Sequence, residues 1–272
     1  MPHPRGAQTH FARVAPVYDR FRDTDPDVVE TITAQLPPRS GRIAVVDIGC
    51  GTGRYSQILA ERIGASLQLI CCDYSEAMLA ECRDRLHSDA THADVGFCRA
   101  SALHLPFGSG CVDAVVTFNA VHHFELERFM TECARILRGG GLLAIYTRTP
   151  KQNARTVWGQ FFPGFTEYET RLYGADRLQA AVAAVPTLAF EGIREFAHVR
   201  SEPADSLVAR ARNFHYSTFA LYPPAEFEAA LSTFAARLAG SAIGKGRIEH
   251  TAENTLVLAH RLSDAPSIDI TP

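Results

Sequence analysis

The sequence contains no uninterrupted apolar run long enough to cross a membrane, and no apolar signal segment follows Met1-Pro2-His3-Pro4-Arg5. A membrane-spanning helix needs about 20 mostly apolar residues. We therefore expect a soluble, cytoplasmic protein with no membrane partner. The length of 272 residues, with 46% hydrophobic and 21% charged residues, suits one α/β core with added segments.

A surplus of positive charge is also missing. The formal net charge is −3, the isoelectric point is near 6.4, and the arginines are scattered rather than gathered in a stripe. Proteins that bind a phosphate backbone usually present a basic surface. The composition therefore predicts a small-molecule ligand and no nucleic acid.

Cysteine patterns typical of metal sites or redox centres are absent as well. The seven cysteines form no C-x-x-C pair and stand at positions 50, 71, 72, 82, 98, 111 and 133. Such pairs are common in zinc sites and in thiol–disulfide centres. We expect buried free thiols in a reducing compartment and no metal.

The chain is organised around a strand that runs into a glycine-rich turn. Residues 43–48 are almost wholly apolar, as in a central parallel strand covered on both faces. Gly49, Gly51 and Gly53 then let the backbone pass close to a ligand, whose polar end would meet free N–H groups at the start of the next helix. A second apolar run ends in Asp73, 20 residues after Gly53, where a carboxylate can bind both hydroxyls of a ribose.

This turn differs from the dinucleotide-binding fingerprint at one position. The pattern G-x-G-x-x-G requires a glycine where this sequence has Arg54. With Asp47 before it, the turn resembles motif I of the class I S-adenosylmethionine-dependent methyltransferases, which is an apolar strand, an acidic residue and G-x-G-x-G. Two other functions stay open: an NAD(P)-dependent oxidoreductase, and a non-catalytic regulatory subunit that binds S-adenosylmethionine.

Three further segments are similar to the same superfamily. Residues 11–22 resemble the N-terminal segment of the ubiquinone/menaquinone C-methyltransferases. Residues 100–107 match D-A-x-x-L-P-F with Ser101 in the place of Asp, and residues 132–141 resemble E-x-x-R-V-L-K-P-G-G. The resemblance covers residues 11–148. It implies an α/β fold, a Rossmann-like doubly wound sheet of seven strands with the last strand antiparallel, an N-terminal helical lid and a helical cap.

The resemblance also implies S-adenosyl-L-methionine as the cofactor. The Ser101 hydroxyl would then accept the hydrogen bond of the adenine amino group less strongly than the usual carboxylate, because it carries no charge. The residues that we expect to bind the cofactor are Tyr18, Asp47, Gly49, Cys50, Gly51, Gly53, Asp73, Tyr74, Met78, Ser101, Ala102, Leu103, Asn119 and His122.

Methyl transfer to a hydroxyl or to a weakly acidic carbon needs a base. The candidates are His122, His123 and Tyr18, although either histidine can instead contact the cofactor or a backbone carbonyl. Aromatic residues crowd the stretch 149–173, which indicates an apolar or aromatic acceptor or else the core of the cap itself. The expected substrate contacts are Phe11, His123, Trp158, Phe161, Phe162, His215 and Tyr216.

The segment after Asn119 contains neither N-P-P-Y, the sequence of base and glutamine N-methyltransferases, nor the aspartate cluster of the catechol O-methyltransferases. We therefore expect no metal and a small apolar, aromatic, heteroaromatic or isoprenoid acceptor, methylated at carbon or oxygen in specialised metabolism. The expected division is a lid at 1–40, a cofactor domain at 41–148, the cap with the last strands at 149–262, and a tail at 263–272. A homodimer or higher homo-oligomer is a further expectation.

Hydrophobic spacing predicts the elements after residue 124. Residues 125–138 read as an amphipathic helix that Gly139, Gly140 and Gly141 would stop. We further expect strands at 142–147, 188–199 and 255–261, a helix at 173–185, and two helices within 205–238.

Overall fold

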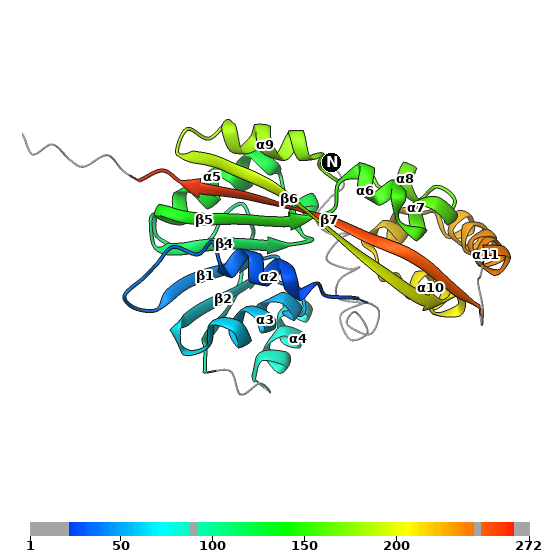
Figure 1. Cartoon of the computed structure of the whole chain (residues 1–272), viewed down its shortest axis with the longest axis horizontal. Coiled ribbons are helices and arrows are strands. Elements are labelled where there is room, and N and C mark those ends of the chain that lie inside the picture. Colours follow the sequence, from blue (N-terminus) through cyan, green and yellow to red (C-terminus); the bar gives the residue numbers. More distant parts are fainter. Residues whose placement is uncertain (1–21, 88–91, 242–245, 264–272) are drawn as a thin grey trace, which may run out of the picture.

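The structure, a computed structural model, describes residues 22–87, 92–241 and 246–263. In these residues seven strands form one sheet with the order β3-β2-β1-β4-β5-β7-β6 (Figure 1). The strands are β1 (Ile43–Ile48), β2 (Leu67–Asp73), β3 (Asp94–Arg99), β4 (Val112–Phe118), β5 (Leu137–Thr147), β6 (Leu188–Pro203) and β7 (Arg247–Arg261). Strands β1 to β5 run parallel, whereas β7 is antiparallel to both β5 and β6. The predicted α/β fold with a seven-stranded sheet and an antiparallel last strand is therefore confirmed.

Helices cover both faces of this sheet (Figure 1). Helices α2 (Pro26–Thr33), α3 (Arg54–Ile63) and α4 (Glu76–His87) pack on one face, and α5 (Leu126–Ile136) and α9 (Ala175–Ala183) pack on the other. Every residue of β4 is buried. Because successive side chains of a strand point to opposite faces, Val115 packs with α5 and α9 while Val116 packs with α2, α3 and α4.

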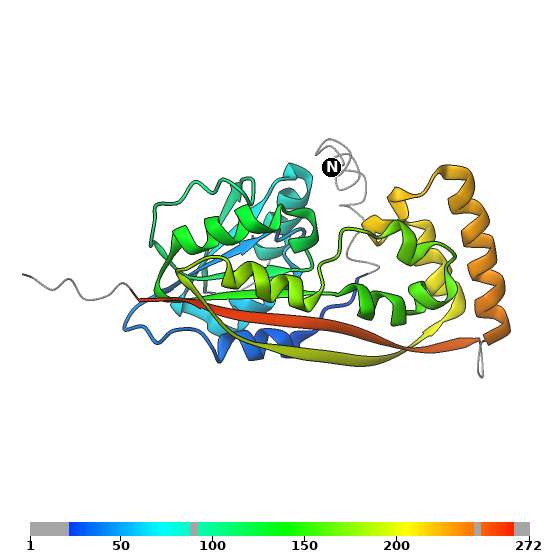
Figure 2. The ribbon, with the colours of Figure 1, turned by 90° about the horizontal axis from the view of Figure 1, so that it is seen from above.

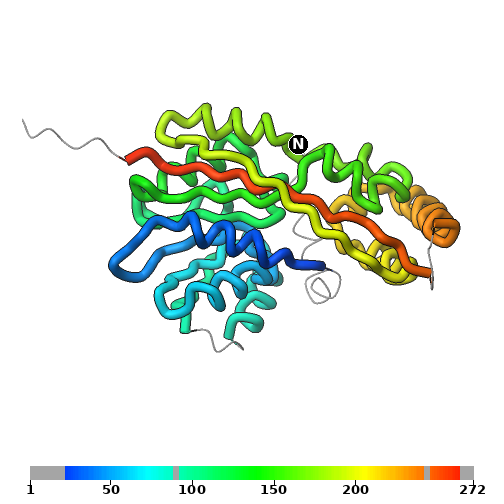
Figure 3. The backbone as a smooth tube through the Cα atoms, in the orientation of Figure 1, coloured from blue at the N-terminus to red at the C-terminus, as the bar shows by residue number. Residues whose placement is uncertain are grey.

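Strands β6 and β7 are longer than the sequence predicts. They contain 16 and 15 residues and stay paired from Leu188↔Arg261 to Pro203↔Arg247, although β5 pairs only with residues 255–260 of β7. The rest of the pair forms a two-stranded ribbon that runs past the sheet, as Figures 2 and 3 show. Alternation of polar and small apolar residues, with no buried run, hid this extension in the sequence.

A separate group of helices, which we call the cap, lies at the far end of the ribbon (Figure 2). It contains α6 (Pro150–Arg155), α7 (Val157–Phe161), α8 (Phe165–Tyr168), α10 (Ala204–Arg212), the 3₁₀ turn η4 (Ser217–Leu221) and α11 (Pro224–Ser241). The cap has a hydrophobic core of its own, in which rings such as Phe162, Phe219 and Phe234 are fully buried or nearly so. The cap is therefore held by its own packing as well as by the ribbon.

The predicted end of the helix at 125–138 is wrong. Helix α5 ends at Ile136, and β5 begins directly at Leu137, so Gly139–Gly141 lies inside the strand. A Cβ atom on Gly141 would come within 3.0 Å of the carbonyl oxygen of Asp113. The glycines therefore lie where the register of the β4–β5 pairing shifts and the two backbones come close together, and they do not end a helix.

None of the helices in the described ranges is both long and apolar enough to span a bilayer. The predicted lid residues Phe11 and Tyr18 lie outside the described residues.

Candidate active site

A cavity of about 770 Å³ lies over the carboxyl ends of the parallel strands and reaches into the cap. Gly49, Tyr74, Asn119 and Arg148 line it, and they follow β1, β2, β4 and β5 in that order. Ligands of open α/β sheets bind at this edge, and the volume falls in the usual range of small-molecule sites. The topology thus brings together segments that are far apart in the chain.

The glycine turn meets the cavity at its start. Gly49, Gly51 and Gly53 all have positive φ angles, of 71°, 56° and 77°, which disfavour a side chain. A Cβ atom on Gly49 would lie 2.6 Å from Cβ of Ala120, and one on Gly53 would lie 2.5 Å from Sγ of Cys82. At Gly51 the same atom would meet no protein atom within 4 Å. Gly51 therefore leaves open space beside the cavity that it lines, whereas Gly53 does not line the cavity and serves packing against α4.

Asp73 joins the turn to the next strand. Its carboxylate accepts hydrogen bonds from the backbone N–H of Gly51 at 2.9 Å and of Ser75 at 2.8 Å. Burial raises the pKa of Asp73, and backbone N–H groups oppose that rise. A carboxylate has about four acceptor positions, so Asp73, which lines the cavity, keeps capacity for the hydroxyls of a bound ribose.

Asp47 is a buried carboxyl group on the same cavity wall. Its Oδ2 accepts a hydrogen bond from the Ser56 hydroxyl at 2.6 Å, while Oδ1 is buried and has no hydrogen-bond partner among the described residues. Burial raises the pKa of Asp47 well above its ordinary value. An unpartnered buried acceptor favours a ligand that brings a donor or a positive charge. The ammonium and sulfonium groups of S-adenosylmethionine fit that requirement.

The expected adenine side of the cavity is also assembled. Tyr74, Met78, Ser101, Ala102 and Leu103 all line it. Their roles toward the cofactor stay predictions.

His122 and His123 lie in the 3₁₀ turn η3 (Val121–His123) that follows β4. Both line the cavity, and their ring centroids are 4.1 Å apart. Burial, together with the positive charges of Arg171, Arg22 and Arg148, lowers the pKa of His122 to about 3. Neutral imidazole is therefore the form of His122 at physiological pH. Asn119, just before this turn, also lines the cavity and has a positive φ of 54°.

The predicted substrate contacts divide into two groups. His215 and Tyr216 line the cavity, whereas Trp158, Phe161 and Phe162 do not and belong to the core of the cap or pack against it. The aromatic crowding in the sequence therefore reflects, for these three rings, the interior of the cap.

The cavity wall contains charged residues that the sequence analysis missed. The cap end is lined by guanidiniums, of which Arg171 pairs with Glu169, Arg200 with Asp25, and Arg210 with Asp23. Glu169 and Arg171 are two positions apart, but Arg200 pairs across 175 positions and Arg210 across 187. Spacing in the sequence does not predict such long-range contacts, so only the fold reveals them.

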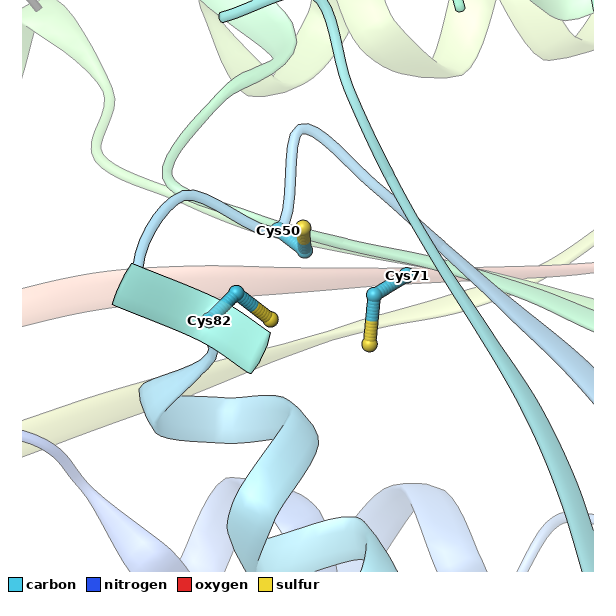
Figure 4. Close-up of side chains that lie close together, drawn as sticks. All are labelled: Cys50, Cys71 and Cys82. Atoms are coloured by element: carbon cyan, nitrogen blue, oxygen red, sulfur yellow. The ribbon is translucent and has the colours of Figure 1, made fainter. Parts of the chain in front are cut away.

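Three thiols lie together beside the glycine turn (Figure 4). The sulfur atoms of Cys50, Cys71 and Cys82 all lie within 4.8 Å of one another, and all three cysteines are free. Cys71 and Cys82 are buried, and Cys50 lines the cavity. Buried thiols act as small hydrophobic groups, and here they fill the space between the turn, β2 and α4.

Comparisons with known proteins agree with this geometry. A family model described as a methyltransferase domain matches residues 46–145. The chain is 34% identical over 119 residues to the probable S-adenosylmethionine-dependent methyltransferase Rv3030 of Mycobacterium tuberculosis, a match that covers 43% of this chain and 40% of that protein. It is 34% identical over 143 residues to the tRNA (carboxymethyluridine(34)-5-O)-methyltransferase ALKBH8 of Mus musculus, which covers 51% of this chain and 19% of that one.

A solved structure extends the likeness to the whole fold. BH2331 of Bacillus halodurans, a candidate methyltransferase, superimposes with a TM-score of 0.62 at 17% identity and covers 89% of this chain and 100% of its own. The curated relatives, by contrast, are matched over about half of their length or less. The sequence similarity is thus confined mainly to strands β1 to β5 and the glycine turn. Residues 46–145 therefore match a methyltransferase domain in sequence, and the chain as a whole is similar in fold to a solved candidate methyltransferase.

Proposed function

We propose that this protein transfers a methyl group from S-adenosylmethionine to a small acceptor bound in the same cavity. One observation supports this most directly: the glycine turn with Asp73 and the charged cap end line one continuous cavity of about 770 Å³. Cofactor and acceptor would then meet without leaving the protein. A bound cofactor supplies an activated methyl group on a sulfonium sulfur.

The residues of this chain would contribute mainly by positioning. Asp73 would hold the ribose, Gly51 would let the backbone approach the cofactor, and the cap would cover the acceptor and exclude water. Holding the two reacting atoms in line and in contact removes much of the entropic cost of a bimolecular reaction. Such an arrangement serves a carbon or an oxygen acceptor equally well.

His122 is a poor candidate for the general base. A base is most effective when its pKa lies near the working pH, and the pKa of His122 is lowered to about 3 by burial and by Arg171, Arg22 and Arg148. We assign His122 a contact role, and the roles of His123 and Tyr18 stay predictions.

The imidazole of His122 is expected to stay neutral from about pH 8 to about pH 5, because its pKa lies lower in the folded protein than in the unfolded chain. Histidine ¹⁵N NMR spectra of the wild type, assigned with His122→Asn, would measure this. The signal in urea, which should titrate near pH 6.5, is the control. Since the unfolded chain takes up this proton first, His122 makes folding less favourable as the pH falls below about 6.5. Titration of the folded signal near neutrality would restore His122 as a base.

For the acceptor we propose a small molecule, with a polar group facing the charged cap end. The likeness to a tRNA methyltransferase does not by itself extend to this chain, whose net charge is −3. Transfer of label to a tRNA pool would contradict this choice.

Calorimetric titration of the wild type with S-adenosylmethionine, S-adenosylhomocysteine and NAD tests the cofactor. Incubation with methyl-labelled cofactor and the small-molecule fraction of a cell extract then tests the transfer. Binding of the first two ligands with a labelled small product supports the proposal. Binding of NAD in their place indicates an oxidoreductase, and cofactor binding without any labelled product indicates a regulatory subunit.

A further inference from the structure

Arg148 stands at the cap end of the cavity and has no carboxylate within 4.0 Å among the described residues. Its Nε donates to the carbonyl oxygen of Glu253 at 3.2 Å, and its Nη1 donates to the hydroxyl of Tyr216 at 3.0 Å. A guanidinium has five N–H donors. Arg148 therefore retains both its full charge and donors, on Nη2 above all, that no described residue takes.

The neighbouring arginines differ from Arg148 in this respect. Arg171 is paired with the buried carboxylate of Glu169, and Arg200 is paired with the nearly buried carboxylate of Asp25 at 2.6 Å. A buried ion pair has little charge left for a ligand, because each partner satisfies the other. Arg148 is thus better placed to bind an anion than the paired arginines Arg171, Arg200 and Arg210.

The pKa values of three nearby side chains, Tyr216, His122 and His215, are lowered in part by the positive charge of Arg148. The Tyr216 ring has the guanidinium carbon of Arg22 at 4.4 Å and that of Arg148 at 5.2 Å from its centroid. Burial raises the pKa of Tyr216, but Arg148 and Arg22 outweigh burial and lower it overall. Burial and some of the same cations also lower the pKa of His122 and of His215. The guanidiniums beside Tyr216 thus favour negative charge at this end of the cavity.

The position of Arg148 separates it from the expected cofactor site. Arg148 follows β5, the glycine turn follows β1, and β4 lies between these strands. Neighbouring strands are about 4.8 Å apart, so the two ends lie about 10 Å apart across the sheet. That spacing suits an acceptor beside the cofactor rather than a part of the cofactor itself.

We propose that Arg148, with the Tyr216 hydroxyl beside it, binds an anionic group of the acceptor, a carboxylate or a phosphate ester. This inference rests on the proposed methyl transfer and names its acceptor class: a small anion whose methyl-accepting atom points back toward the glycine turn. Arginine binds both groups through two parallel hydrogen bonds.

The test is calorimetric titration of the protein saturated with S-adenosylhomocysteine. The probes are benzoate, its neutral counterpart benzamide, and inorganic pyrophosphate, so that the two anions distinguish a carboxylate site from a phosphate site. We expect one or both anions to bind and benzamide not to bind. In Arg148→Met the dissociation constant of that anion should rise at least about tenfold, with partial recovery in Arg148→Lys. Arg155→Met is the matched control, because Arg155 pairs with Glu253 and does not line the cavity.

Three outcomes would overturn the proposal: no binding of either anion, a benzamide affinity equal to that of the anion that binds, or unchanged affinity for that anion in Arg148→Met. A loss of S-adenosylhomocysteine affinity in Arg148→Met, with anion binding intact, would assign Arg148 to the cofactor and also overturn it. If the wild type binds no S-adenosylhomocysteine, the proposed function fails, and the same titrations on the free protein still decide whether Arg148 binds anions.

Discussion

Replacing Asp73 by alanine is expected to raise the dissociation constant for S-adenosylhomocysteine at least about 100-fold. The carboxylate would bind two ribose hydroxyls, and each hydrogen bond to a charged group contributes about 1.5–3 kcal/mol, while about 2.8 kcal/mol corresponds to a 100-fold change. Alanine also frees the N–H groups of Gly51 and Ser75, which Asp73 now holds. The turn would lose its support together with its ligand contact.

Calorimetric titration measures this loss, and two variants make it specific. Asp73→Asn keeps the shape and one acceptor oxygen, so it should lie between the wild type and the alanine variant. Asp94→Ala removes an exposed carboxylate that pairs with Arg42 at the start of β3 and should bind as the wild type does. Undiminished affinity in a folded Asp73→Ala protein would disprove the ribose contact and remove the main support for this cofactor site.

Replacing Gly51 by alanine is expected to weaken cofactor binding by at least about tenfold while changing the melting temperature little. Gly51 has a φ of 56°, and a Cβ atom there would meet no protein atom within 4 Å. The methyl group would instead enter the space in which the backbone is to meet the cofactor. A positive φ costs a side-chain-bearing residue about 1–2 kcal/mol, so a small loss of stability is also expected.

Two other glycines separate these effects. Gly64 has equally open surroundings and does not line the cavity. Its φ of 65° and ψ of −140° are a combination that favours glycine strongly, so Gly64→Ala reports a backbone cost without a ligand contact. Gly49→Ala would add a collision with Ala120 at 2.6 Å and should lower the melting temperature more than Gly51→Ala does. Thermal unfolding beside calorimetry gives both quantities. Equal cofactor affinities of the Gly51 and Gly64 variants would show that the turn does not approach the ligand at Gly51.

The part of the cavity wall beside the glycine turn could be predicted from the sequence because its residues are close together in the chain. Gly49, Gly51 and Asp73 belong to two consecutive strand ends, and in a parallel sheet consecutive βα units bring those ends side by side. Ile48 and Cys72 are register partners, so Gly49 and Asp73, which follow them, lie side by side. The local sequence pattern and the topology of the sheet therefore both predict that these residues lie together.

The cap end of the cavity could not be predicted in this way. Arg148, Arg171 and Tyr216 come from a strand end, a connection and a loop before η4, and only the cap and the long ribbon bring them to one wall. Trp158 and Phe162 show the opposite error, a predicted substrate contact that is a core residue. An aromatic residue looks the same in the sequence whether its ring lines a cavity or packs in a hydrophobic core. Burial, which decides between them, depends on the whole fold.

The β6–β7 ribbon also suggests how the segment between its two strands can change during evolution. Glu195 and Thr255 are register partners, so the chain between them leaves and rejoins the sheet at points only about 5 Å apart. Another segment of any length with the same two anchor points would close the same loop, at an entropic cost that grows only slowly with length. The part of the cavity wall that residues 196–254 contribute can thus change in length and sequence while the strand ends of the sheet stay in place, provided that the new segment still completes the cap core that it shares with α7 and α8.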